Sequence, residues 1–381
     1  MATASRKAPA KRQHVDKVVV WVVTCLAAFG VVAVYSAISF LAATRADGDT
    51  ERYLFSHLFK LGLALGLMGA FSFIHYRLVA RVSRLALLGS LALLVVVKIV
   101  GTTTGGATRW LDLGGFGFQP SDFARPALVV FIATMLSAKQ AYIKDFGRGF
   151  APILLWMMLT TVLIGVENLS TAAVTLVAVG AMCFVGRVNV MHLAGVALVG
   201  LVLAYVLLLG SPGRAARIEA YTGLKLFPNT EAAEVFSDQA EGYQAKQARI
   251  AFAMGGLTGA GPGKSVQRDF LPAPYNDFIF AIIAEEYGML GALVLLALFV
   301  FLLWRGFLHV ARPAPDPLGL LLGVGLTTMI VLYGVVHAGV ASGLLPVTGL
   351  PLPFVSYGGT SMITNGIMVG ILLNISRGAK E

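Results

Sequence analysis

NDFIFAIIAEEYG, residues Asn276 to Gly288, starts as a polar segment and continues into a long apolar run. It carries three carboxylates, Asp277, Glu285 and Glu286, whereas the other apolar runs of the chain contain almost no acid. A carboxylate in a bilayer costs roughly 2.5–3.5 kcal/mol on insertion scales, so such a residue usually has a function or a partner. The stretch therefore predicts a membrane helix with candidate functional acids at its start.

The composition of the whole chain indicates the same class. Of 381 residues, 57% are hydrophobic and only 13% are charged, which is more apolar surface than one soluble core could bury. The net charge of +10 is explained by Lys and Arg in cytoplasmic loops, so no nucleic-acid partner is expected. We predict an all-α, polytopic integral membrane protein.

Ten apolar runs are long enough to cross a membrane. They lie at 18–42, 54–74, 84–101, 123–138, 149–166, 170–186, 190–210, 277–304, 317–342 and 355–375. We predict one ten-helix domain over 18–377, a disordered basic tail over 1–17 and a short tail over 378–381.

The distribution of positive charge sets the expected orientation. The basic N-terminal tail and turns such as the one containing Arg77, Arg81 and Arg84 fall on the same side of a ten-span chain, so both termini are expected in the cytoplasm. Residues 211–276 then form a long extracytoplasmic loop between the seventh and eighth helices. The segment at Asn276 is expected to begin at the outer face.

Helix geometry separates the three acids. With Asp277 in the first turn, Glu285 lies about 12 Å deeper and is rotated by about 80°, while Glu286 is rotated by about 180°. One ligand is not expected to touch all three. Asp277 is either a helix N-cap or a functional acid at the surface. Glu285 and Glu286 are expected to pair with buried cations such as Arg125 or Lys98.

Three further segments are too irregular for simple linkers. Residues 101–126 combine glycines with aromatic residues, which suits either a re-entrant piece or an aromatic anchor at headgroup level, and Asp122 with Arg125 is spaced for a structural i, i+3 ion pair. Residues 342–361 contain prolines and glycines that do not fit a regular helix, and irregular backbone at membrane depth predicts a cavity.

The third segment is the later part of the long loop, residues 243–276. Its glycine-rich part runs up to Gly263, Lys264 and Ser265, like a phosphate loop. Thr258 stands where that motif requires glycine, and an all-helical chain lacks the strand–loop–helix context, so nucleotide binding is rejected. Backbone N–H groups flanked by Lys264 and Arg268 could still hold a phosphate at the membrane surface. The alternative is a basic loop resting on anionic headgroups.

Three long segments resemble the signature segments of the shape, elongation, division and sporulation family. They are GATRWLDLG with FQPSDFAR, GGLTGAGPGKSVQRDFLPAPYNDFIFAIIAEEYG, and GLLPVTGLPLPFVSYGGTS, and the resemblance extends over 18–377. It implies a ten-helix peptidoglycan glycosyltransferase that polymerises lipid II into glycan strands outside the bacterial cytoplasmic membrane, paired with a class B penicillin-binding protein. GPGKSVQRDFLP and ENLSTA resemble the division branch, with divisome partners, more than the elongation branch, which remains the alternative.

Family positions transfer to this chain as follows. The essential aspartate of the DFIFA motif corresponds to Asp277, and the acid–base pair of QPSE-x-x-K corresponds to Asp122 and Arg125. Where many members have QPDLGTA, this chain has VENLSTA, so Asn168 replaces the acid and a carboxylate role there would require Glu167.

The expected chemistry is attack of a sugar hydroxyl on an anomeric carbon as a polyprenyl pyrophosphate leaves. Asp277 is the expected general base, and the pyrophosphate would be neutralised by protein cations or by a divalent cation, Mg²⁺ or Mn²⁺, whose ligands the sequence does not identify. The expected substrate-contacting residues are Arg109, Gln244, Lys264, Arg268, Ser356 and Tyr357.

Two alternatives belong to other functional classes. A transporter that flips a lipid-linked precursor would use ionisable residues near the midplane, such as Glu285 and Glu286. A noncatalytic scaffold would not require Asp277.

Overall fold

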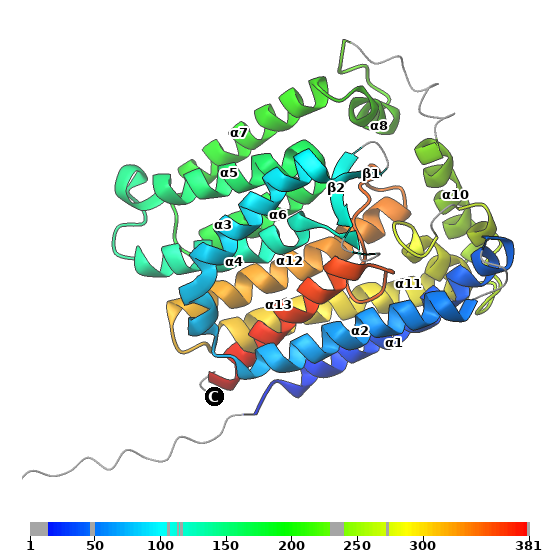
Figure 1. Ribbon diagram of the computed structural model, residues 1–381, viewed down its shortest axis with the longest axis horizontal. Helices are drawn as coiled ribbons and strands as arrows, with labels where there is room; N and C mark the ends of the chain where they lie inside the picture. The colour runs from blue at the N-terminus through cyan, green and yellow to red at the C-terminus, as the bar shows by residue number, and fades with distance from the viewer. Residues whose placement is uncertain are drawn as a thin grey trace, which may run out of the picture.

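The computed structural model describes residues 14–45, 50–104, 107–112, 114, 117–228, 240–271 and 274–378. Most of this part of the chain is helical (Figure 1). The elements in chain order are α1 (Lys17–Arg45), α2 (Thr50–Phe73), α3 (Tyr76–Val100), β1 (Thr102–Thr104), β2 (Ala107–Asp112), β3 (Gly117–Phe118), α4 (Pro120–Ala138), η1 (Phe146–Phe150), α5 (Ala151–Glu167), α6 (Leu169–Val185), α7 (Val190–Leu209), α8 (Pro212–Thr222), α10 (Ala240–Gly255), η2 (Gln267–Asp269), α11 (Ile279–Arg305), η3 (Gly306–Ala311), α12 (Pro317–Ala341) and α13 (Gly359–Gly378).

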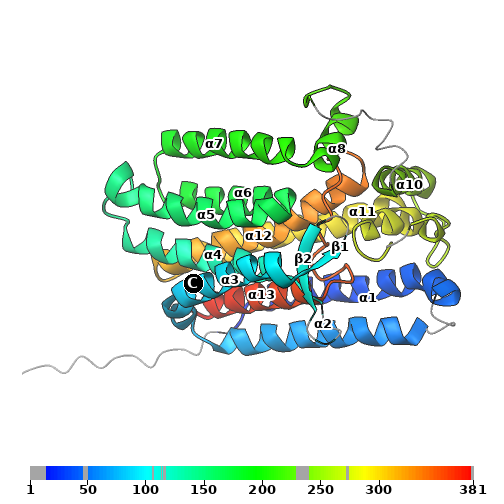
Figure 2. The ribbon, with the colours of Figure 1, turned by 45° about the horizontal axis from the view of Figure 1, so that its top comes forward.

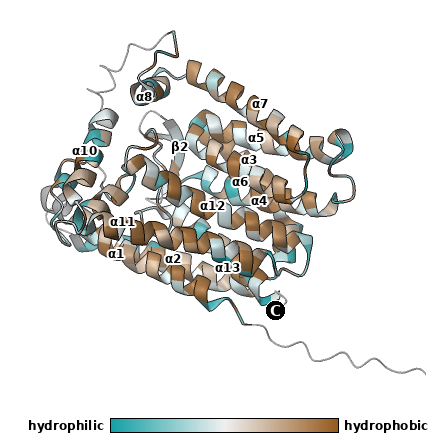
Figure 3. Cartoon of the chain, turned by 180° about the vertical axis from the view of Figure 1, so that it is seen from behind, coloured by the Kyte–Doolittle hydropathy of each residue, from teal (hydrophilic) through white to brown (hydrophobic). Residues whose placement is uncertain are grey.

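The predicted all-α membrane architecture is confirmed. Within the described ranges, nine helices are long and apolar enough to cross a bilayer, and Figure 3 shows hydrophobic residues along most of their length. The predicted run at 170–186 corresponds to α6, which has 17 residues and is shorter than those nine. A count of ten spans therefore stays a prediction, as does the disordered tail, since residues 1–13 and 379–381 lie outside the described ranges.

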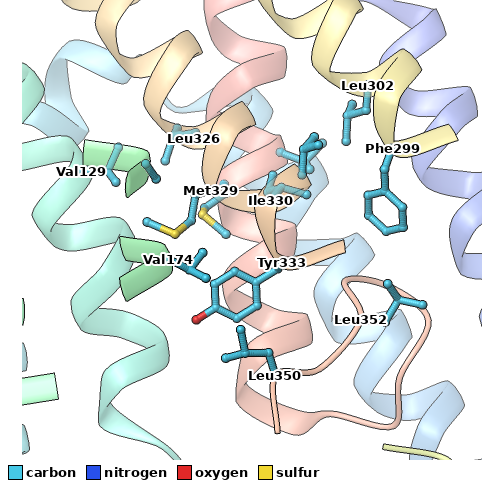
Figure 4. Packing of buried hydrophobic residues seen from close by; sticks show 14 of the residues in the cluster. Val129, Val174, Phe299, Leu302, Leu326, Met329, Ile330, Tyr333, Leu350 and Leu352 are labelled. Atoms are coloured by element: carbon cyan, nitrogen blue, oxygen red, sulfur yellow. The ribbon is translucent and has the colours of Figure 1, made fainter. Parts of the chain in front are cut away.

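The helices lie roughly side by side around α12 and α13 (Figures 1 and 2). These two are the most enclosed of the candidate spans, whereas α7 stands at the edge of the bundle, and Val196 is its one buried residue. On α12, Met329, Ile330 and Tyr333 pack among apolar side chains that include Val174 of α6 (Figure 4). The enclosed pair fixes the position of the loop that joins α12 to α13.

Residues 102–118 contain a small sheet that the sequence analysis did not predict. Strands β1, β2 and β3 form an antiparallel sheet in that order, with Thr102 paired to Trp110 and Leu111 paired to Phe118. The β-branched run Thr102–Thr104 favours a strand. The prediction of a re-entrant or anchoring piece gave weight to the glycines and aromatic residues and overlooked this run.

The run 277–304 was predicted as one continuous helix, but α11 is broken within it. Gly288 has φ 68° and ψ −171°, which breaks the helix after its first nine residues. The glycine-rich segment, residues 256–267, follows α10 and docks on the break. Ala260 N donates to Glu285 O at 2.9 Å, and Met289 N donates to Gly256 O at 2.9 Å. A Cβ on Gly288 would lie 2.4 Å from Leu257 O, so only glycine allows this approach.

Candidate active site

A cavity of about 950 Å³ lies where the irregular segments meet. Its lining comes from β2, the start of α4, the junction of α5 and α6, α8, α10, the segment before α11 and the loop between α12 and α13. The Pro- and Gly-rich loop at 346–351 forms part of the wall, as its irregular backbone predicts. The lining includes Arg109, Asp122, Glu167, Arg214, Arg217, Gln244, Asp277 and Tyr357.

Asp277 is half-buried in this lining, two residues before α11 begins. Phe278 holds the N-cap position and makes no side-chain cap, so the alternative of Asp277 as an N-cap is not the observed geometry. A Cβ built on Gly349, which has φ 65°, would lie 3.6 Å from Asp277 Oδ2. The carboxylate thus lies against the loop between α12 and α13.

Ser356 and Tyr357 fix the backbone around Asp277. Ser356 Oγ donates to Asn276 O at 2.8 Å and accepts from Leu352 N at 2.8 Å, and Tyr357 N donates to Tyr275 O at 2.9 Å. Ser356 is buried and does not line the cavity, so it positions the segment instead of contacting a ligand there. Tyr357 does line it.

Three arginines bring positive charge to the cavity. Arg109, which lies in β2, was predicted to contact the substrate, but Arg214 and Arg217 of α8 were missed. Arg214 donates to the carbonyls of Gly165, Val166 and Glu167 at 2.7–3.2 Å and so caps the C-terminal end of α5. Burial lowers the pKa of Arg214, and the charges of Arg217 and Arg109 lower it further. This crowding of cations favours an anionic ligand.

The junction of α5 and α6 places a carboxylate in the cavity, although Asn168 stands where many family members have an acid. Asn168 caps α6, its Oδ1 accepting from Thr171 N at 3.0 Å. Glu167 lines the cavity, is 3% exposed and lies 3.7 Å from Lys98 Nζ. The carboxylate at this junction therefore belongs to Glu167.

The pair Asp122 and Arg125 forms the i, i+3 contact that its spacing predicts. Arg125 Nη2 lies 2.6 Å from Asp122 Oδ1, and both side chains are buried. Thr360 of α13 donates to the other Asp122 oxygen, and the Arg125 guanidinium lies 4.1 Å from the centre of the Tyr333 ring on α12. The pair joins three helices at the wall of the cavity, which Asp122 lines.

Comparison with known proteins places the chain in a family. Residues 16–381 match the family described as "Cell cycle protein", which groups FtsW, RodA and SpoVE. The chain belongs to this family. Stage V sporulation protein E of Bacillus subtilis (strain 168) is 36% identical, and the match covers 96% of this chain and 98% of that protein. The "Probable peptidoglycan glycosyltransferase FtsW" of Geobacter metallireducens is also 36% identical, covering 96% and 95%.

Solved structures show the same fold. The rod shape determining protein RodA of Thermus thermophilus has a TM-score of 0.69 at 27% identity, covering 96% of this chain and 98% of that one. A chain from the structure of a peptidoglycan synthase complex has a TM-score of 0.71 at 27% identity, covering 95% and 98%. The predicted resemblance is confirmed, and glycosyltransferase is the enzyme class named for several relatives.

Two cations predicted to contact substrate lie elsewhere in this FtsW, RodA and SpoVE family member. Lys264 and Arg268 are absent from the cavity lining. Lys264 is exposed in the glycine-rich segment, and Arg268 donates to Ser36 O at 3.2 Å. A substrate contact by either residue stays a prediction that this cavity does not support.

The glycine-rich segment, which was considered as a phosphate site, binds the carboxylate of Glu285 from α11. Its carboxylate accepts from Ser265 Oγ and from the backbone N–H groups of Val266 and Gln267, the latter two at 2.9–3.3 Å. Glu286 accepts from Ser36 Oγ of α1. The expected pairing of both acids with Arg125 or Lys98 is wrong, because those cations pair with Asp122 and Glu167. Buried hydroxyl and amide donors were available closer to the acids.

A metal held by side chains alone does not fit the described part of this family member. Its residues contain no group of three or more His, Cys, Asp or Glu that could hold an ion. Three cavity acids, Asp122, Glu167 and Asp277, share the lining with three arginines. The divalent cation, Mg²⁺ or Mn²⁺, that was considered from the sequence stays a prediction.

Proposed function

We propose that this protein is a peptidoglycan glycosyltransferase that polymerises lipid II at the outer face of the bacterial cytoplasmic membrane, with both termini in the cytoplasm. The observation that carries the proposal is the convergence of Asp277 with three arginines on one cavity of about 950 Å³. Membership of the FtsW, RodA and SpoVE family and the names of its relatives support the same activity. The cavity matches a substrate that combines sugars with a diphosphate.

The proposed step joins two sugars. A hydroxyl of the acceptor sugar attacks the anomeric carbon of the donor, the bond from that carbon to the diphosphate oxygen breaks, and the diphosphate departs with the electron pair. Asp277 accepts the hydroxyl proton, a contribution of typically 10²–10⁴ in rate. Arg109 and Arg217 compensate the charge on the departing diphosphate, while Arg214, held by the end of α5, adds to the local field.

The proposed partner is a class B penicillin-binding protein, and the proposed process is septal synthesis with divisome proteins. One structural neighbour belongs to a peptidoglycan synthase complex, which supports a partnership of polymerase and crosslinking enzyme. The division role is supported by the FtsW names among the relatives and by the resemblance of GPGKSVQRDFLP and ENLSTA to the division branch.

Gel analysis of lipid II polymerisation by the purified protein with its penicillin-binding partner tests the function. The wild type is expected to make glycan strands and Asp277→Ala none. A correctly folded Asp277→Ala protein that still made strands would remove Asp277 as the base. A wild-type complex that made none would remove the proposed activity.

A further inference from the structure

Lys60 is a cation near the middle of a membrane helix. It lies ten residues after the start of α2, about 15 Å along the helix axis. None of the ion pairs within the described ranges includes Lys60; its ammonium instead lies 4.0 Å from the centre of the Tyr357 ring. A lysine at membrane depth is costly and usually marks a binding site or an ion path.

His57 lies one helical turn before Lys60 and is also without a polar partner. Its side chain is 0% exposed, and neither ring nitrogen has a hydrogen-bond partner in the described part of the protein. Whichever tautomer is present, a neutral imidazole carries one N–H donor, and burying a donor without an acceptor is unfavourable. The two residues therefore offer a positive charge and an unused donor from the same face of α2.

Tyr357 connects this pair to the cavity. His57 stacks on its ring, with centroids 5.9 Å apart, and its hydroxyl donates to Ser56 Oγ at 2.9 Å. Tyr357 lines the cavity, whereas His57, Lys60 and the rest of the described part of α2 do not. The tyrosine ring thus contacts the buried His57 and the partly exposed Lys60 at the edge of the cavity, and its displacement would open both to the cavity.

We propose that Lys60 and His57 form a second phosphate site, covered by Tyr357, for the diphosphate of a polyprenyl lipid. The inference rests on the proposed function, because joining two lipid-linked sugars requires two diphosphates near one base. The arginines of the cavity compensate one of them. Lys60 supplies the charge for the other, His57 supplies a hydrogen bond, and the position of Lys60 within α2 suits a lipid that enters from the bilayer.

Native mass spectrometry of the purified, full-length protein with undecaprenyl diphosphate tests this site without turnover. The wild type is expected to bind two molecules and Lys60→Met one, because losing a charged contact weakens binding by about 10- to 100-fold. Lys60→Arg keeps the charge and is expected to bind two. Lys144→Met, which removes an exposed lysine outside the cavity lining, is the matched control and is also expected to bind two.

Several outcomes would overturn the proposal. If Lys60→Met bound two molecules of undecaprenyl diphosphate, or if the wild type bound only one, the proposed second site would be wrong. If phosphatidylglycerol at equal concentration displaced the molecule that depends on Lys60, the site would belong to a headgroup phosphate and the diphosphate assignment would fail. Two bound diphosphates on a protein that made no glycan would leave the site in place and reject the proposed function.

Discussion

The two ends of the segment 277–286 place the same chemical group in opposite settings. Asp277 is half-buried in the lining of the cavity and lies beside Gly349. Glu285 and Glu286, each 1% exposed, are engaged by donors from the glycine-rich segment and from α1. The buried glutamates hold separate segments of the protein together, whereas Asp277 lies at the cavity wall, where a substrate can reach its carboxylate.

The same contrast holds for the cations. Arg109 and Arg217 line the cavity, while Arg268 lies outside the lining and donates a hydrogen bond to Ser36 O. Charge type alone does not separate the two groups, because both regions contain acids, arginines and glycines. The difference lies in which backbone donors and acceptors surround each side chain, and each prediction below tests one side of it.

The largest expected effect is that of Asp277→Asn on polymerisation. Removing the base is expected to lower kcat by about 10²–10⁴, while the free energy of unfolding falls by only about 1 kcal/mol, because Asn keeps the side-chain shape and one acceptor oxygen. Glycan synthesis on gels and thermal unfolding in detergent measure the two quantities. Asp269→Asn, at an exposed acid outside the cavity lining, is the control and is expected to keep full activity. Equal losses in both variants would contradict the assignment.

At the other end of the segment, Glu285→Ala is expected to act on stability. It leaves the hydroxyl of Ser265 and the N–H groups of Val266 and Gln267 without their acceptor, at a cost of about 3 kcal/mol. Glu285→Gln keeps one acceptor oxygen and is expected to lose about 1 kcal/mol. The measurement is reversible unfolding in mixed detergent.

Glu51→Ala, at an exposed acid early in α2, is the control for Glu285 and is expected to unfold like the wild type. A stable Glu285→Ala protein with no polymerisation would reverse the comparison. It would make Glu285 a functional acid, as the transporter alternative requires.

A smaller effect is expected from the cations. Arg109→Ala is expected to lower kcat/KM by about 10- to 100-fold, because it removes a charged contact to the diphosphate. Lys264→Ala, whose side chain is exposed and outside the lining, is expected to stay within about 2-fold. Initial rates against lipid II concentration provide the comparison. If Lys264→Ala were as impaired as Arg109→Ala, the glycine-rich segment would regain its place as a substrate site.

The sequence predicted the membrane helices well because lipid leaves the backbone few choices. An apolar run in a bilayer must satisfy its own hydrogen bonds, so length and hydropathy suffice to locate it. The same reasoning missed the break at Gly288, because that break depends on carbonyls of Gly256 and Leu257 that dock from an earlier part of the chain. No local pattern reports that contact.

The site was predicted in part for the same reason. Asp277, Arg109, Gln244 and Tyr357, which were predicted to act on or contact the substrate, line the cavity, and their roles stay predictions. Arg214 and Arg217 sit in a mixed-charge helix, and only the direction of α8 shows that they reach the cavity. The partners of Glu285 lie 18–20 residues before it and come close only because the glycine-rich segment folds back.

The smallest effect separates two glycines that share a backbone conformation. Gly349 has φ 65° and Gly263 has φ 74°, so alanine at either position costs about 1–2 kcal/mol of strain. Around Gly263 a Cβ would meet nothing within 4 Å, whereas at Gly349 it would touch the Asp277 carboxylate. Both variants are therefore expected to lose similar stability, but only Gly349→Ala is expected to lose activity, by about 10-fold, because relief of the backbone strain at 349 moves the loop that lies against the reacting carboxylate. Unfolding and polymerisation measured on the pair isolate that contact. If the two alanine variants had equal activity, the position of Asp277 against the loop would not limit the reaction, and the loop would serve only to enclose the cavity.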